Sequence, residues 1–174
     1  KTMLRLIDDH KSPNFGDRRG QNPVDMLVLH YTDAQDCETA LGWLCDPVRQ
    51  VSAHYLVDED GSVYRLVEEE KRAWHAGVSF WAGETDVNSR SIGIEIQNPG
   101  HGNGYRAFPD RQMEAVIALC REVIERYSIP ERNVLAHSDI APGRKTDPGE
   151  LFDWQRLADQ GVGYFPDAST GSSD

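Results

Sequence analysis

Asn133-Val134-Leu135-Ala136-His137 is typical of a short buried strand with a histidine at its end. The loop that follows, bent by proline and glycine, carries Lys145 and Asp147. Far upstream, the apolar run 26–29 leads into His30 in the same way. Two histidines at strand ends and a nearby aspartate make two nitrogen donors and one oxygen donor. This set suits zinc with its fourth position open for water, so the pattern predicts a zinc hydrolase.

Length and composition predict one globular domain. The chain has 174 residues, of which 39% are hydrophobic and 27% charged, a balance that excludes a mainly disordered protein. Its formal charge is -11, from 29 acidic against 18 basic residues, which disfavours nucleic acid and anionic lipid as partners. No apolar run approaches the roughly 20 residues of a transmembrane segment. The chain begins with Lys1, which suggests a processed product.

Hydrophobic periodicity predicts the α/β class, with a mixed central β-sheet flanked by helices. Strands are expected over 24–31, 53–57, 62–67, 91–97 and 133–136, and helices over 38–45, 110–127 and 153–158. Asp110 is the expected N-cap of the long helix. The predicted organisation is an irregular N-terminal arm (1–23), one catalytic domain (24–166) and a flexible polar tail (167–174).

The six histidines are not equivalent. His10 and His101 lie in polar or glycine-rich segments and are expected at the surface. His54 lies on a predicted strand, where a hydrogen-bonded structural role is favoured. His75 has small neighbours that would let a ligand approach, so substrate contact and a packed loop are equally good interpretations. His30 alone could equally be a ligand or a structural residue. Its combination with His137 and Asp147 favours the role of metal ligand.

Glu95 stands out because it lies mid-strand, where a glutamate is costly to bury unpaired. Strict alternation places it with Gly93 on the face opposite to the isoleucines of 92–96. A carboxylate lining a cleft is the preferred interpretation, and an edge strand with the carboxylate in water is the alternative. For Asp147, the alternative to metal binding is the N-cap of the last helix, a role that could coexist with it. For Lys145, the alternative to a role in the site is simple solvent exposure.

The number of cysteines, three, does not show whether the protein contains a disulfide bond. Cys120 falls on the core face of the long predicted helix and is interpreted as a buried thiol. Whether Cys37 pairs with Cys45 stays open. A cysteine hydrolase is disfavoured because none of the three lies beside a histidine motif.

Five ordered segments together resemble one known family. They are Leu29-His-Tyr-Thr, Val51-Ser-Ala-His-Tyr-Leu, Ala73-Trp-His-Ala-Gly, Ile92-Gly-Ile-Glu-Ile and the loop from His137 to Gly149. The chain is similar, over about residues 24 to 165, to the zinc-dependent N-acetylmuramoyl-L-alanine amidases related to phage T7 lysozyme and the peptidoglycan recognition proteins. Within that group it most resembles the bacterial periplasmic and outer-membrane amidases with a catalytic glutamate.

The resemblance implies a mixed sheet with one Zn²⁺ per chain at one end. It places the zinc ligands on His30, His137 and Asp147, the catalytic glutamate on Glu95 and a catalytic lysine on Lys145. The implied reaction is hydrolysis of the amide between N-acetylmuramic acid and L-alanine of the peptidoglycan stem peptide.

The resemblance also implies peptidoglycan or muropeptides, including 1,6-anhydro forms, as partners. It implies an exported protein of the periplasm or outer membrane. The alternative is a peptidoglycan-recognition module that binds wall fragments without cutting them, as relatives do that have lost a zinc ligand. The intact ligand trio, with Glu95 and Lys145, argues against that alternative.

Overall fold

A six-stranded mixed β-sheet lies at the centre of the computed structural model, which describes residues 3–165. Its strand order is β1-β5-β4-β7-β3-β8, and a separate two-stranded sheet joins β2 to β6. The strands are β1 (Arg5–Ile7), β2 (Phe15–Asp17), β3 (Met26–Tyr31), β4 (Tyr55–Val57), β5 (Ser62–Arg65), β6 (Lys71–Ala73), β7 (Ser91–Ile96) and β8 (Val134–Ala136). The helices are α1 (Cys37–Leu44), η1 (Val87–Arg90), α2 (Asp110–Tyr127), η2 (Glu131–Asn133), α3 (His137–Ile140) and α4 (Trp154–Asp159).

The middle of the sheet is parallel. Strands β4, β7, β3 and β8 run side by side in one direction, while β5 returns antiparallel to β4. The strands expected at 53–57 and 62–67 therefore form a hairpin, with Gly61 at a φ of +91° in its turn. The expected mixed sheet is confirmed as well.

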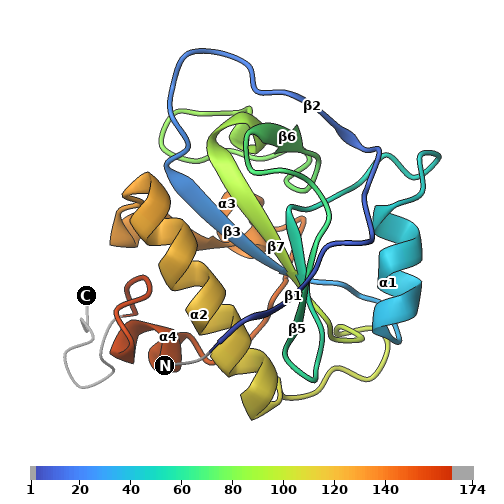
Figure 1. Ribbon diagram of the computed structural model, residues 1–174. Coiled ribbons are helices and arrows are strands. Elements are labelled where there is room, and N and C mark those ends of the chain that lie inside the picture. The colour runs from blue at the N-terminus through green and yellow to red at the C-terminus, as the bar shows by residue number, and fades with distance from the viewer. Residues whose placement is uncertain (1–2, 166–174) are drawn as a thin grey trace.

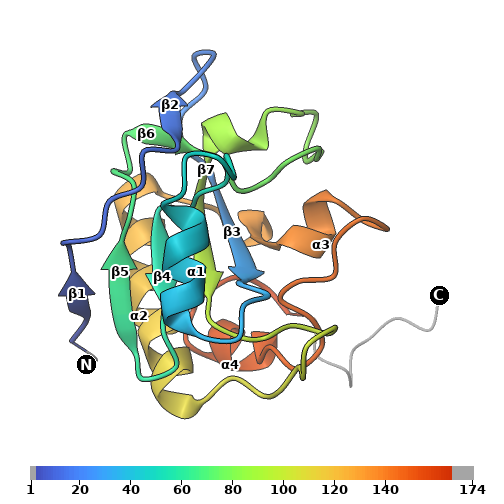
Figure 2. The ribbon, with the colours of Figure 1, turned by 90° about the vertical axis from the view of Figure 1, so that its right-hand side faces the viewer.

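Helices cover both faces of the sheet, α2 on one and α1 on the other (Figures 1 and 2). On β7 the side chains of Ile92, Ile94 and Ile96 are completely buried in the same cluster as the apolar stripe of α2. The opposite face buries Met26 and Val28 of β3 in a smaller cluster. Alternation along the strands therefore leaves the second face for the polar groups of the site.

Two segments differ from the expectation of an irregular arm. Strand β1 extends the main sheet parallel to β5, and β2 pairs with β6. Both strands are three residues long and mostly exposed, so they lack the apolar alternation that marks a strand in sequence. The tail predicted over 167–174 lies outside the described residues.

The positions of three helices differ from what the sequence led us to expect. Pro109, rather than Asp110, is the N-cap of α2, and the Asp110 carboxylate accepts a hydrogen bond from Arg156 at 2.9 Å. Helix α4 is capped by Asp153, so the N-cap alternative for Asp147 is wrong. The loop expected after β8 begins with one helical turn, α3, because the chain bends directly after Ala136.

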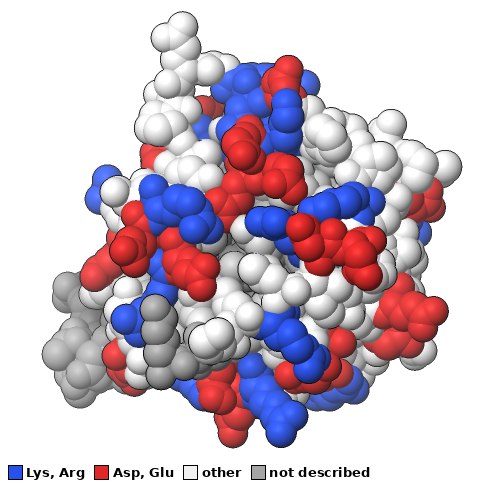
Figure 3. Space-filling model, viewed as in Figure 1, with Lys and Arg blue, Asp and Glu red and all other residues white. Residues whose placement is uncertain are grey.

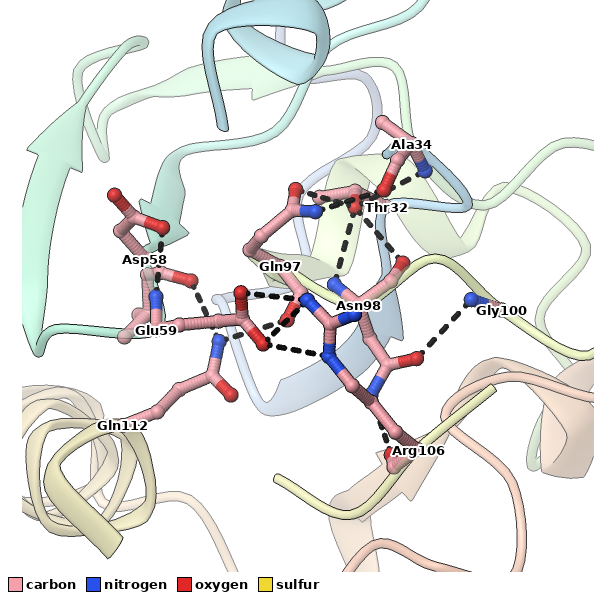
Figure 4. A network of polar contacts seen from close by, with 10 residues as sticks. Thr32, Ala34, Asp58, Glu59, Gln97, Asn98, Gly100, Arg106 and Gln112 are labelled. Atoms are coloured by element: carbon pink, nitrogen blue, oxygen red, sulfur yellow. Dashed lines mark hydrogen bonds and ion pairs between the residues drawn. The ribbon is translucent and has the colours of Figure 1, made fainter. Parts of the chain in front are cut away.

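Buried amides join the ends of the parallel strands (Figure 4). The side chain of Gln97 accepts from the hydroxyl of Thr32 at 2.8 Å and donates to the carbonyl of Ala34 at 2.7 Å. Gln112 of α2 donates to the carbonyls of Val57 and Gln97 at 3.1 and 2.9 Å. The last residue of β4 and the segments that follow β3 and β7 are therefore held together at the end of the sheet where the candidate site lies.

Gln97→Leu is expected to lower the free energy of unfolding by about 1–3 kcal/mol, because it leaves buried polar partners unsatisfied. Urea denaturation measures this change. The nearby Arg106–Glu59 ion pair is partly exposed, so Glu59→Gln is expected to cost less than about 1 kcal/mol. Equal effects of the two substitutions would contradict the role given to the buried amides.

Candidate metal centre

Strand register places the first two groups of the site side by side. His30 of β3 is the direct partner of Glu95 on the parallel neighbour β7. On the other side of β3, Ala136 of β8 is the partner of Leu29, so His137 follows at the level of His30. Three segments far apart in sequence thus bring their polar side chains to one end of the sheet.

Three donor atoms converge at this end. The Nδ1 atoms of His30 and His137 lie 2.9 Å apart. An Oδ2 atom of Asp147 lies 3.3 Å from the first and 3.2 Å from the second. All three residues are buried, and together they form a group able to hold a metal ion.

The chemistry of these atoms fits a metal ion. The Nε2 atom of His137 lies 2.9 Å from the Ala76 carbonyl, which can only accept, so the ring proton is on Nε2 and Nδ1 presents a lone pair. With the ring proton of His30 on Nε2, its Nδ1 atom also presents a lone pair, and a cation between the three acceptor atoms would balance them. Ligand atoms about 2.0–2.2 Å from a tetrahedral ion lie roughly 3.2–3.6 Å apart, close to the separations found here.

Burial sets the protonation of these groups. It lowers the pKa of His30 to about 4, so His30 is neutral at pH 7. Burial opposes ionisation of Asp147, but the adjacent imidazoles of His137 and His30 outweigh it and hold the pKa of this carboxyl below its usual range. A neutral imidazole and an ionised carboxylate are the forms that bind metals.

Glu95 lies at the edge of the donor cluster. Its side chain is 13% exposed, and Oε2 is 3.9 Å from Nδ1 of His30. Burial and the charge of Asp147 raise the pKa of its carboxyl well above the usual range, partly opposed by Lys145. Because β7 lies between β4 and β3, the edge-strand alternative is wrong.

A cavity of about 450 Å³ opens above these groups. Its wall includes the three donor residues, Glu95 and the exposed Lys145. The remaining lining includes aromatic and basic side chains, among them Trp43, Trp74, Arg49 and Arg144, beside small polar and aliphatic ones. The arrangement joins a metal-binding group, a buried carboxyl and an ammonium in one solvent-accessible space.

The other predicted histidines take different places. His54 is buried, donates to the carbonyl of Lys71 at 2.9 Å and accepts from the amide of Gly93 at 3.0 Å, which confirms its structural role. His10 and His101 are at the surface, as predicted. His75 borders the cavity but is buried beside His30, and its contact with substrate stays a prediction.

Two residues near the site were not predicted. Arg144 donates to the carbonyl of Ala76 at 2.9 Å, the same oxygen that His137 uses. Asn88 bonds the backbone of His75 and Ala76. No sequence signal marks either contact, because each partner is a main-chain atom that any residue would supply.

The cysteines lie away from the cavity. Cys37, Cys45 and Cys120 are free thiols, and none of them lines it. Burial raises the pKa of Cys120 to about 12, and the same cause, with the charge of Asp58, raises the pKa of Cys37 to about 12. A thiolate nucleophile is therefore disfavoured.

Charged side chains are interspersed on the face of the molecule shown in Figure 3. Basic groups there alternate with acidic ones. A nucleic-acid site would require a continuous basic band, which this face does not show. Within residues 3–165, no helix has both the length and the apolar character needed to cross a membrane.

A family model described as N-acetylmuramoyl-L-alanine amidase matches residues 20–150, three quarters of the chain. The chain belongs to this family. Amidase AmiD of Escherichia coli is 45% identical in an alignment 157 residues long that covers 83% of this chain and 56% of AmiD. The 1,6-anhydro-N-acetylmuramyl-L-alanine amidase AmpD of the same organism is also 45% identical, covering 84% of this chain and 87% of AmpD. The chain thus spans little more than half the length of AmiD.

Solved amidase structures share the fold. AmiD in complex with anhydro-N-acetylmuramic acid-L-Ala-D-gamma-Glu-L-Lys superposes with a TM-score of 0.78 at 40% identity, covering 90% of this chain and 69% of AmiD. AmpDh3 of Pseudomonas aeruginosa with anhydromuramic pentapeptide gives 0.77 at 36% identity, covering 92% and 66%. These amidase neighbours confirm the expected fold class and the resemblance.

Proposed function

We propose that this chain is the catalytic part of a zinc-dependent N-acetylmuramoyl-L-alanine amidase, with the catalytic domain over 24–166. It would hydrolyse the amide between the lactyl group of N-acetylmuramic acid and L-alanine of the stem peptide. The observation that carries the proposal is the convergence of His30, His137 and Asp147 beside Glu95 in an open cavity. Relatives named for this reaction support it.

Zinc is the proposed ion, held by His30, His137 and Asp147. Two nitrogen donors and one oxygen donor match the three-ligand sets of catalytic zinc sites, in which one position stays open. When bound there, zinc would supply Lewis acidity toward the substrate carbonyl and lower the pKa of water toward about 7.

Glu95 is the proposed general base and acid. Its carboxyl would take a proton from the attacking water and pass it to the departing alanine nitrogen. Burial raises the pKa of this carboxyl above its usual range, which is the direction expected of a group that must return the proton as well as take it.

Lys145 is proposed to stabilise the negative oxygen of the tetrahedral intermediate through its ammonium group, which lines the same cavity. Lys145→Ala is expected to lower kcat by roughly 10²–10³-fold with no loss of zinc, because it removes one donor to that oxygen. Turnover and elemental analysis measure the two quantities. Lys11→Ala, a surface change next to Asp8, serves as the control. A normal kcat for Lys145→Ala would reduce Lys145 to a surface residue.

Product analysis tests the function itself. Purified sacculi and 1,6-anhydro-muropeptides are incubated with the protein, with and without a chelator, and the products are identified by mass spectrometry. Free stem peptide that disappears with chelator is the expected result. Bound but uncut muropeptide would instead identify a recognition module.

The site of action follows from the same resemblance. We propose an exported protein of the periplasm or outer membrane, where peptidoglycan is accessible. Fractionation of cells that produce the natural protein, with detection by antibody, tests this. Recovery in the cytoplasm alone would contradict it.

A further inference from the structure

The dipeptide His75-Ala76 lies behind both imidazoles of the metal centre. On one side, Nε2 of His30 is 2.9 Å from Nδ1 of His75. On the other, Nε2 of His137 donates to the carbonyl of Ala76 at 2.9 Å. For Nδ1 of His30 to bind a metal, its ring proton must be on Nε2, and His75 is then the acceptor of that proton.

Asn88 holds this dipeptide in place. Its side-chain oxygen accepts from the backbone amide of His75 at 3.1 Å and from that of Ala76 at 2.9 Å. Asn88 is buried and lies in η1, the turn directly before β7. One amide oxygen therefore fixes the backbone that orients two rings from distant segments, His30 of β3 and His137 of α3.

The position of the His75 ring is set from below by β7. Nε2 of His75 is 2.9 Å from the hydroxyl of Ser91. A Cβ atom at Gly93 would lie 2.5 Å from the ring, closer than side-chain atoms approach one another. The ring thus fits only over a glycine, which explains why the strand leaves space next to Glu95.

We infer that Asn88 and His75 are positioning residues for the metal: through one dipeptide, Asn88 orients both histidine ligands. This inference rests on the proposed metal binding. Partners outside the ligands fix the ring orientation and the proton position of a metal-bound imidazole, and losing one typically weakens metal affinity about 10–100-fold. Because Asn88 supports both rings, its loss is expected to weaken metal affinity toward the upper end of that range.

The test is the dissociation constant of Zn²⁺, measured by competition with a chromophoric chelator on the folded, metal-depleted protein. Asn88→Leu and His75→Phe are each expected to bind zinc roughly 10–100-fold more weakly than the unchanged chain. Asn88→Asp keeps an oxygen acceptor for the two amides and is expected to lose less than about 10-fold.

Asn133→Leu is the matched control. Asn133 is equally buried and bonds Trp81 and the carbonyl of Asp25, but none of the three ligands. Thermal unfolding of the metal-free proteins reports the stability that each substitution costs. We expect Asn133→Leu to lose stability and to keep its zinc affinity.

The outcomes separate the inference from the proposed function. An unchanged chain that binds no zinc would overturn both. Tight zinc binding by the unchanged chain and equally tight binding by Asn88→Leu and His75→Phe would overturn the inference alone. The inference would also be overturned if Asn133→Leu lost as much zinc affinity as Asn88→Leu and His75→Phe. Should one of the two variants not fold, the other decides.

Discussion

Glu95→Gln is expected to keep one zinc ion per chain while kcat falls by roughly 10²–10⁴-fold. The substitution preserves the size of the side chain but removes the group that accepts and returns the proton. None of the three converging donor atoms belongs to Glu95, so the metal-binding group stays intact. Elemental analysis and a muropeptide turnover assay on the same sample measure both quantities.

Two comparisons sharpen this experiment. Glu38→Gln, at an exposed position of α1, is the control and is expected to keep normal turnover. Circular dichroism checks that both variants are folded. Full activity of Glu95→Gln would remove Glu95 from the mechanism. Loss of zinc would instead make it a ligand or a residue that holds one.

His30→Ala is expected to contain less than stoichiometric zinc and to lose activity to the level of the chelator-treated protein. The change removes one of three donors and leaves two, too few for a stable catalytic zinc site. It also leaves His75 without its partner at Nδ1. Elemental analysis after dialysis measures the metal.

The control here is His101→Ala, which removes a histidine from the surface next to Glu150. It is expected to keep one zinc ion and normal turnover. Stoichiometric zinc in His30→Ala would mean that another residue is the ligand, and the proposed site would then have to be redrawn.

The sequence by itself predicted those features that have a local pattern. The alternation around Ile94 and the apolar stripe ending at Tyr127 record which side of one element is buried, so β7 and α2 appear where they were expected. The five ordered motifs identified the family, and they contain every side chain of the proposed site.

Only the tertiary structure decided how those side chains meet. The pairing of His30 with Glu95 depends on strand register, and a shift by one residue would turn the two to opposite faces. The support that Asn88 provides runs through backbone atoms, which every residue possesses, so no residue type marks it. Strand β1 likewise joins the sheet through main-chain pairing with little apolar pattern. The apolar pattern of a strand or helix shows which of its faces is buried, so this feature can be predicted from the local sequence. Contacts between main-chain atoms of distant segments leave no such pattern and arise only when the chain is folded.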